Sequence, residues 1–150
     1  MADPDLVTML NAQRGGFNIA LGLVFTRASA DEVACEVPVG PHLVQPYGLV
    51  HGGVYSSIVE TLASVGAAIV AMPQGLAPVG VENTTSFLRA VRSGTLRGEA
   101  KPLHRGRTTQ VWEVEIRGDD GKLAATGRVR VLCLEAGTEI AGQSVPVRPG

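Results

Sequence analysis

The chain has 150 residues, of which 45% are hydrophobic and 18% charged, and its formal net charge is −1 at pH 7. This size and composition predict one soluble domain, residues 1–136, with a substantial core. The near-neutral charge argues against a nucleic-acid partner and against a membrane-surface partner, because both would require an excess of basic residues.

The cysteines and the N-terminus predict a cytoplasmic protein. Cys35 and Cys133 lie alone in apolar alternating segments, without the spacing of a paired-cysteine motif, which suits reduced core thiols. The first residues, 1–5, are acidic at positions 3 and 5 and lack the basic and apolar regions of a signal peptide.

The N-terminal quarter predicts a short helix and then a hairpin. Asp3 suits an N-cap and Pro4 the first helical position, so we expect a helix over about residues 4–13, which Gly15-Gly16 ends. Two extended runs, 23–28 and 32–39, flank a short polar turn, and the second run alternates between apolar and polar residues. This pattern is typical of a β-hairpin.

Residues 54–72 are almost wholly apolar or small, and Pro73 follows them. The run is too long for a strand and predicts a buried helix. It also reaches the minimum length of a membrane span, roughly 17 residues. Against a span stand the charge of Glu60, several hydroxyl side chains, and the strand patterns in the rest of the chain. We therefore expect the core helix of a soluble protein, with no membrane partner.

Three further strands are expected, near residues 95–101, 110–117 and 123–134, with a hairpin turn at Asp119-Asp120-Gly121. Short connections predict a mainly antiparallel sheet, so the fold class is α+β, with one sheet curled around one helix. A helix that is apolar nearly all round needs more cover than one sheet face gives, which predicts dimerisation. Residues 137–150 have little periodicity and predict a mobile C-terminal tail.

Glu60 is the one charge within the apolar helix, and Gly52-Gly53 stand at the start of that helix. An ionised carboxylate in apolar surroundings requires a partner, solvent or a function. The alternatives are a Glu60 that reaches solvent or pairs with a distant arginine. Two glycines at a helix start let a substrate approach the backbone N–H groups, which indicates an oxyanion hole; the alternative is a simple tight turn.

Glu60 and Gly52 cannot act on one carbonyl within one chain, because eight residues of helix separate them by roughly 12 Å. A two-fold dimer with antiparallel helices would bring each helix start opposite the partner's carboxylate. Ser64 shares the helix face of Glu60 and could hold the carboxylate or a water. The histidines His42, His51 and His104 lack metal-ligand spacing, so we expect no metal and no cofactor.

The stretch Gln45-Pro46-Tyr47-Gly48-Leu49-Val50-His51-Gly52-Gly53, followed by Glu60 and Ser64, resembles the active-site signature of hotdog-fold acyl-CoA thioesterases. The similarity covers about residues 22–134 and is greatest to the PaaI-like branch that hydrolyses aromatic acyl-CoA esters, such as 4-hydroxybenzoyl-CoA and 1,4-dihydroxy-2-naphthoyl-CoA. It implies a long central helix wrapped by a five- or six-stranded sheet, in homodimers or in dimers of dimers (homotetramers).

The resemblance also implies roles for individual residues. Glu60 would be the nucleophile or general base, and the Gly52 N–H would polarise the thioester carbonyl. Gln45 and His51 would help to position that carbonyl, and Ser64 would orient the water or Glu60.

For the coenzyme A part of the substrate, the resemblance implies contacts from Arg89, Arg107 and Thr108, and from Gly53 at the helix start. The alternative for the arginines is ordinary surface exposure. We expect an aromatic or a short to medium acyl group. A hotdog module that binds acyl-CoA or fatty acyl groups without hydrolysis is the alternative function, and Glu60 argues against it because a pure binder needs no such carboxylate. A hotdog hydratase is a weaker interpretation, since its different histidine signature is missing.

Overall fold

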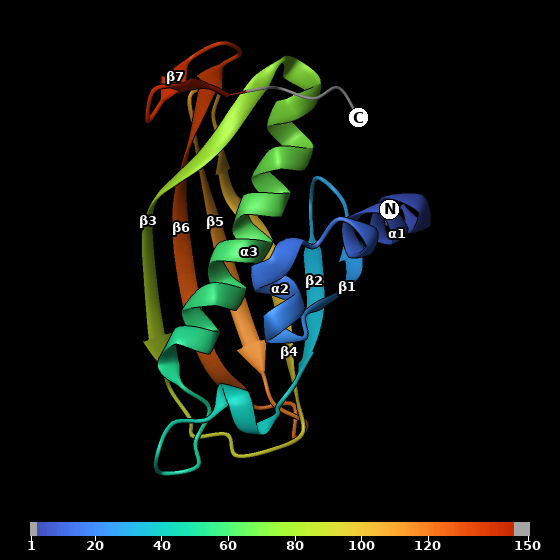
Figure 1. Cartoon of the computed structure of the whole chain (residues 1–150), viewed down its shortest axis with the longest axis vertical. Helices are drawn as coiled ribbons and strands as arrows, with labels where there is room; N and C mark the ends of the chain where they lie inside the picture. Colours follow the sequence, from blue (N-terminus) through green and yellow to red (C-terminus); the bar gives the residue numbers. More distant parts are fainter. Residues whose placement is uncertain (1–2, 146–150) are drawn as a thin grey trace.

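The computed structural model describes residues 3–145 of the chain. One long helix, α3, lies along one face of a six-stranded antiparallel sheet (Figure 1). The strand order is β1-β2-β4-β5-β6-β3, so β1 and β3 form the two edges. The helices are α1 (Pro4–Ala12), α2 (Gly15–Leu21) and α3 (Gly52–Ala71), and the strands of this sheet are β1 (Val24–Ala28), β2 (Val33–Pro38), β3 (Leu76–Phe87), β4 (Thr95–Arg105), β5 (Thr109–Arg117) and β6 (Leu123–Glu135).

The core lies between α3 and the inner face of the sheet. Ile58 and Leu62 of α3 are fully buried, as are Leu96 and Ile116 on the strands. Gly66 of α3 allows close packing, because a Cβ at this position would lie 2.5 Å from the Trp112 ring. The α+β layout predicted from the sequence is therefore confirmed, with six strands in the sheet.

The α3 helix and the turn after it, Gly52–Gln74, are long and apolar enough to cross a membrane, but half of the most apolar window is buried inside the protein. This is the setting of a core helix, which passes the same test of length and composition. The helix begins at Gly52, so the glycine pair lies at its start as expected, and His51 caps it there. A short 3-10 turn, Met72–Gln74, ends it around Pro73.

The N-terminal segment differs from the prediction in one respect. Asp3 caps α1 as expected, since its Oδ1 accepts hydrogen bonds from the N–H groups of Asp5 and Leu6. Gly15-Gly16, however, do not simply end a helix: they begin a second one, α2. Its Asn18 side chain accepts a hydrogen bond of 3.0 Å from the Thr61 hydroxyl of α3, so a tertiary contact fixes this short helix.

The sequence patterns also failed to indicate β3 as a separate strand. It pairs with β6 over its full length, from Leu76 opposite Glu135 to Phe87 opposite Ala125. Most of β3 is exposed, and its central residues are polar, so no alternation between apolar and polar residues marks it. The register shifts between Gly80 and Glu82, where Val81 is the extra residue of a β-bulge.

The C-terminal segment contains a small hairpin where the sequence predicts a tail without regular structure. Its strands are β7 (Glu139–Ile140) and β8 (Gln143–Ser144), which pair with each other and not with the main sheet. The rest of the expected tail, residues 146–150, lies outside the described residues. The mobility of the segment stays a prediction.

Candidate active site

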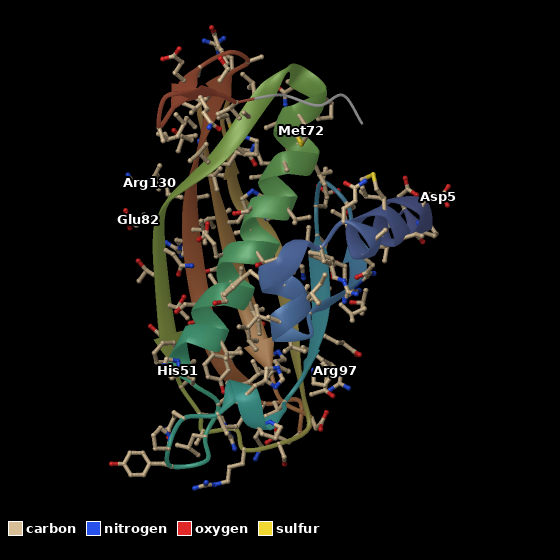
Figure 2. The ribbon with its side chains drawn as sticks, in the orientation of Figure 1. Asp5, His51, Met72, Glu82, Arg97 and Arg130 are labelled. Carbon is tan, nitrogen blue, oxygen red and sulfur yellow. The ribbon has the colours of Figure 1, made fainter. Side chains whose placement is uncertain are left out.

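The start of α3 presents one unpaired backbone donor. The ring of His51, labelled in Figure 2, turns back onto the helix, and its Nδ1 accepts the Gly53 N–H at 2.8 Å. The backbone N–H of His51 donates to the Leu43 carbonyl at 2.8 Å, which fixes the entry of the chain. Within residues 3–145 no acceptor pairs with the Gly52 N–H. Of the two glycines, Gly52 is thus the one whose amide remains for a ligand, and the helix dipole favours negative charge there.

Gln45 lines the same cavity as Gly52, a space of about 320 Å³ that Tyr55, Phe87 and Arg89 also line. The Gln45 Oε1 accepts the N–H of Tyr47 within its own loop, so the Nε2 of the amide is left to donate. The family resemblance implied that Gln45 and Gly52 act on one group, and the structure brings them to one cavity.

Two aromatic rings form the apolar wall of this cavity. The centroids of Tyr55 and Phe87 are 5.8 Å apart, and the Phe87 ring lies so close to Gly52 that a Cβ there would be 2.6 Å from its Cε2. Tyr55 is buried, which raises the pKa of its phenol, and its hydroxyl has no hydrogen-bond partner among the described residues. Glycine at position 52 is therefore required for the ring to reach the helix start.

Glu60 lies midway along α3, on the side that faces β3. Its Oε1 accepts a hydrogen bond of 3.2 Å from the Ser64 hydroxyl, and its Oε2 accepts one of 3.1 Å from the Asn83 amide. In the part of the chain that the structure describes, no Lys, Arg or His side chain lies within ion-pair distance of this carboxylate. The alternative of a distant arginine partner is thus not what this structure contains. Ser64 makes the contact predicted from its position on the helix, whereas sequence patterns gave no indication of Asn83.

Glu60 and Gly52 belong to the same unbroken helix, eight residues apart, so roughly 12 Å of helix axis separates them. The side chain of Glu60 faces the β3 edge of the sheet, and the cavity with Gly52 lies at the end of the helix. Within one chain, the carboxylate and the amide donor are therefore too far apart to contact the same substrate atom. The spacing in the sequence predicted this separation.

The predicted coenzyme A contacts fall at opposite ends of the sheet. Arg89 borders the cavity with Gly52, and its guanidinium is half exposed, 3.6 Å from Asp120. Arg107 and Thr108 form the turn between β4 and β5. The backbone N–H of Arg89 contacts Ala124, and the carbonyl of Thr108 contacts Cys133 of the same strand. Ala124 and Cys133 are nine residues apart on β6, which is roughly 30 Å at about 3.3 Å per strand residue.

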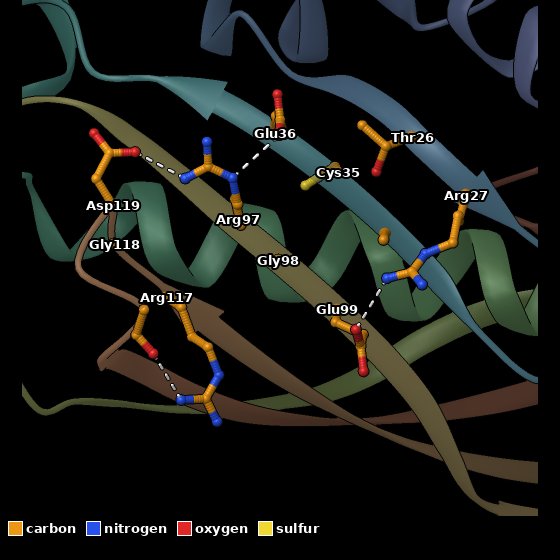
Figure 3. A pocket seen from close by; sticks show the side chains of 12 residues that line it. Thr26, Arg27, Cys35, Glu36, Arg97, Gly98, Glu99, Arg117, Gly118 and Asp119 are labelled. Carbon is orange, nitrogen blue, oxygen red and sulfur yellow. Dashed lines mark hydrogen bonds and ion pairs between the residues drawn. The ribbon is translucent and has the colours of Figure 1, made fainter.

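A second groove, of about 570 Å³, lies on the outer face of the sheet (Figure 3). Its charges are satisfied by one another: Arg97 contacts Glu36 at 3.2 Å and Asp119 at 2.8 Å. Burial raises the pKa of the neighbouring Cys35 thiol to about 12, so this thiol is no nucleophile at neutral pH. The groove offers paired surface charges and no reactive group. Over residues 3–145, no cluster of three His, Cys, Asp or Glu side chains could hold a metal.

Comparison with known proteins identifies the family of the chain. A model of the thioesterase superfamily matches residues 47–125, which include the helix start, Glu60 and the strands β3, β4 and β5. The chain belongs to this superfamily. It is 37% identical to the proofreading thioesterase EntH of Klebsiella pneumoniae over 126 residues, which cover 83% of the chain and 91% of that protein.

Solved structures of thioesterases share the fold. A mutant of the thioesterase PA1618 from Pseudomonas aeruginosa is 31% identical, with a TM-score of 0.81 over 85% of this chain and 93% of that one. Thioesterase HI1161 from Haemophilus influenzae is 29% identical, with a TM-score of 0.81 over 86% of this chain and 90% of that one. The predicted hotdog fold and the predicted thioester hydrolase are confirmed. A hydrolase, rather than the alternative binding module, is what these thioesterases support.

Proposed function

We propose that this thioesterase hydrolyses an acyl-CoA at a site that two copies of the chain share. The observation that carries the proposal is a pair of groups on α3: an amide N–H without an acceptor and a carboxylate without a cation partner. The Gly52 N–H has no acceptor among the described residues, and the Glu60 carboxylate contacts only neutral donors. Both groups suit acyl transfer, one as an oxyanion donor and one as a base or nucleophile, but roughly 12 Å separates them in one chain.

The open edge at β3 supports a dimer. This edge strand has 12 residues, and most of them are exposed. Large apolar side chains lie on and beside it: Val81 is 48% exposed, Phe87 56% and Leu88 54%. Unpaired strand edges with exposed apolar residues are covered in stable proteins. Two-fold pairing at β3 would set the α3 helices side by side and antiparallel, with each Gly52 near the Glu60 of the partner. The proposal covers a homodimer and a dimer of dimers.

The chemistry follows from these groups. The thioester carbonyl oxygen accepts hydrogen bonds from the Gly52 N–H and from Gln45 Nε2, which stabilise the negative charge that develops on it. Glu60 either removes a proton from the attacking water, which Ser64 helps to orient, or attacks the carbonyl carbon itself. In both routes the C–S bond breaks and coenzyme A leaves as the thiol after it takes up a proton. In the first route water supplies the second oxygen of the free acid directly. In the second, water hydrolyses the mixed anhydride formed with Glu60, which releases the acid and restores the carboxylate. The carboxylate provides the reactivity, so the proposal needs no metal and no cofactor.

The cavity at Gly52 suits the acyl group. Tyr55 and Phe87 line it, and its volume of about 320 Å³ fits an aromatic or a short to medium acyl chain. Arg89 lies at its rim and would contact the coenzyme A of the same site. Because Arg107 and Thr108 lie at the far end of the sheet, they would reach that coenzyme A from the partner. A cytoplasmic location remains a prediction.

Hydrolysis of a panel of acyl-CoA esters, followed with a thiol reagent, tests the role of Glu60. We expect Glu60→Ala to lower kcat by roughly a thousandfold or more, because it removes the group that activates the attack. Glu82→Ala is the matched control, since this carboxylate lies on β3 but pairs with Arg130 on the outer face at 2.6 Å (Figure 2). Equal rates for wild type and Glu60→Ala would remove Glu60 from the mechanism.

Hybrid dimers test whether the site is shared. Proline at position 52 removes the N–H and is tolerated at the first helical position, but its ring would collide with Phe87, so the change is made in a Phe87→Ala background. Both parent variants, Glu60→Ala and Gly52→Pro, carry Phe87→Ala, and each lacks one component of every site. A random mixture should recover about a quarter of the Phe87→Ala activity, since half of the dimers are hybrids with one complete site. No recovery in confirmed hybrids would contradict a shared site.

A further inference from the structure

The carboxylate of Glu60 is held from two sides. Ser64, one turn further along α3, donates to Oε1, and Asn83 of β3 donates to Oε2. The two donors contact different oxygens, so together they fix the plane of the carboxylate and not only its position. The contact from β3 crosses between two elements, 23 residues apart in the chain.

Asn83 is itself held in one orientation. The Thr85 hydroxyl donates to Asn83 Oδ1 at 2.7 Å, and the amide Nδ2 donates to the Ser56 carbonyl at 3.1 Å as well as to Glu60. Since the hydroxyl satisfies the amide oxygen and the carbonyl can only accept, the amide nitrogen must face α3. An amide flip would place an oxygen against the carboxylate, so the network selects the donor.

The β-bulge at Val81 determines which side chain faces Glu60. Before the bulge, Gly80 pairs with the inward-facing Val131; after it, Asn83 pairs with the inward-facing Val129. Successive residues of a strand point to opposite faces, and one extra residue inverts that alternation. Without the bulge Glu82 would face α3, and a second carboxylate would lie next to Glu60.

Gly80 completes this arrangement. A Cβ at this position would overlap Glu60 Oε1, so the absence of a side chain makes the space that the carboxylate occupies. Glu82, turned to the outer face, contacts Arg130 instead. The bulge therefore presents a neutral donor to Glu60 and removes a like charge from it. Bulges that redirect a side chain are typical of strands next to active sites.

We infer that Asn83, held by Thr85 and aimed by the bulge in β3, is the positioning residue for the Glu60 carboxylate in hydrolysis. This inference rests on the proposed role of Glu60. Asn83 does not touch the thioester; it fixes the direction from which the carboxylate approaches the water or the carbonyl carbon. A hydrogen bond to a charged group that holds this direction should affect kcat and leave substrate binding unchanged.

Steady-state kinetics of Asn83→Ala with an acyl-CoA that the wild type hydrolyses test the inference. We expect kcat to fall about tenfold to a hundredfold, as for the loss of one hydrogen bond to a charged group, and KM to stay within about twofold. Asn83→Asp should lose at least as much, although it has the same shape, because it replaces a donor with a like charge. Thr84→Ala is the matched control: it lies next in the strand and faces the outer groove with Glu82 and Arg128.

A double-variant comparison separates positioning from a structural effect. If Asn83 acts through Glu60, then Asn83→Ala should not lower the residual rate of Glu60→Gln any further. A proportional further loss, unchanged kcat in Asn83→Ala, or an equal loss in Thr84→Ala would each overturn the inference. If Glu60→Gln is as active as wild type, the proposed role of Glu60 fails and this inference fails with it. If Glu60→Gln is inactive and Asn83→Ala is fully active, only the positioning role fails.

Discussion

The two faces of the sheet hold their carboxylates in different ways. On the outer face Glu36 and Asp119 both contact the guanidinium of Arg97, at 3.2 and 2.8 Å. On the inner face, at the β3 edge, Glu60 contacts a hydroxyl and an amide and no cation among residues 3–145. Both settings satisfy the oxygens with hydrogen bonds, but only the outer one neutralises the charge.

The difference fits the proposed role of Glu60. An arginine across from a carboxylate balances its charge and occupies its lone pairs, which suits a solvated surface that must stay soluble and unreactive. Neutral donors fix the direction of Glu60 without pairing it with a cation, which is the setting that the proposed role as base or nucleophile requires. The four changes below exchange or disturb these two settings.

The largest effect should come from giving Glu60 the partner that the outer carboxylates have. Asn83→Lys places an ammonium within reach of the Glu60 carboxylate, and we expect kcat to fall by roughly a hundredfold or more, because the charge needed for attack is neutralised. Each chain should still fold, since position 83 is exposed on the edge strand of the single chain. Kinetics with acyl-CoA and thermal unfolding measure both properties. Thr84→Lys, on the outward side, is the control, and an equal loss in both variants would contradict this explanation.

A smaller loss is expected from Gly80→Ala. The backbone of Gly80 is not in the left-handed region, so alanine is acceptable to the chain itself, and the conflict arises only with Glu60 Oε1. We expect kcat to fall about tenfold as the carboxylate shifts, with a loss of about 1 kcal/mol in the free energy of unfolding.

The Glu60→Ala background provides the control for Gly80→Ala. With the carboxylate removed, the added methyl group has space, so Gly80→Ala should no longer destabilise the protein in denaturant unfolding. A stability loss of the same size in both backgrounds would mean that the methyl group conflicts with something other than Glu60.

The contrast between the two faces also explains what the sequence could predict. Strands with one buried and one exposed face alternate strictly between buried and exposed residues. In β5, for example, Gln110, Trp112, Val114 and Ile116 are buried on the inner side, and such strands are recognised from their period of two. The long helix and the N-cap at Asp3 were recognised by equally local signals. The short helix α2 was not, because its stability depends on contacts such as Asn18 with Thr61 rather than on its own glycine-rich sequence.

The candidate site divides in the same way. Gly52, Glu60 and Ser64 lie on one helix, so their spacing alone predicts that Ser64 contacts Glu60 and that Gly52 is too far from Glu60 to share a ligand within one chain. Asn83 could not be predicted, because β3 is exposed, polar and interrupted by a bulge that inverts its alternation. Even a correct strand assignment without the bulge would have turned Asn83 outward. The helix half of the site is local in sequence, and the strand half depends on a register that only the folded sheet defines.

A third change tests the hydrogen bond between the His51 ring and the Gly53 N–H at the start of α3. His51→Ala removes the side-chain acceptor of the Gly53 N–H, and we expect a loss of about 1 kcal/mol in the free energy of unfolding, the usual effect of removing an N-cap. Denaturant unfolding measures it. His51→Asn should restore most of the loss, because asparagine is a favourable N-cap, and a variant as unstable as His51→Ala would show that the histidine ring acts by packing instead.

The smallest effect is expected on the outer face, from Arg97→Gln. At neutral pH kcat should not change, since this side chain lies on the face of the sheet opposite α3 (Figure 3). The hydrogen bond from Arg97 lowers the pKa of Asp119 from its usual 3.8, so this contact stabilises the fold above that pH and is lost as the pH falls through the lowered value. Arg97→Gln should therefore unfold at a slightly higher pH in an acid titration followed by circular dichroism. Because both groups are exposed, high salt should reduce the difference from wild type. A loss of kcat at neutral pH would show that the charges of the outer face reach the site, and the separation between the two faces would then be wrong.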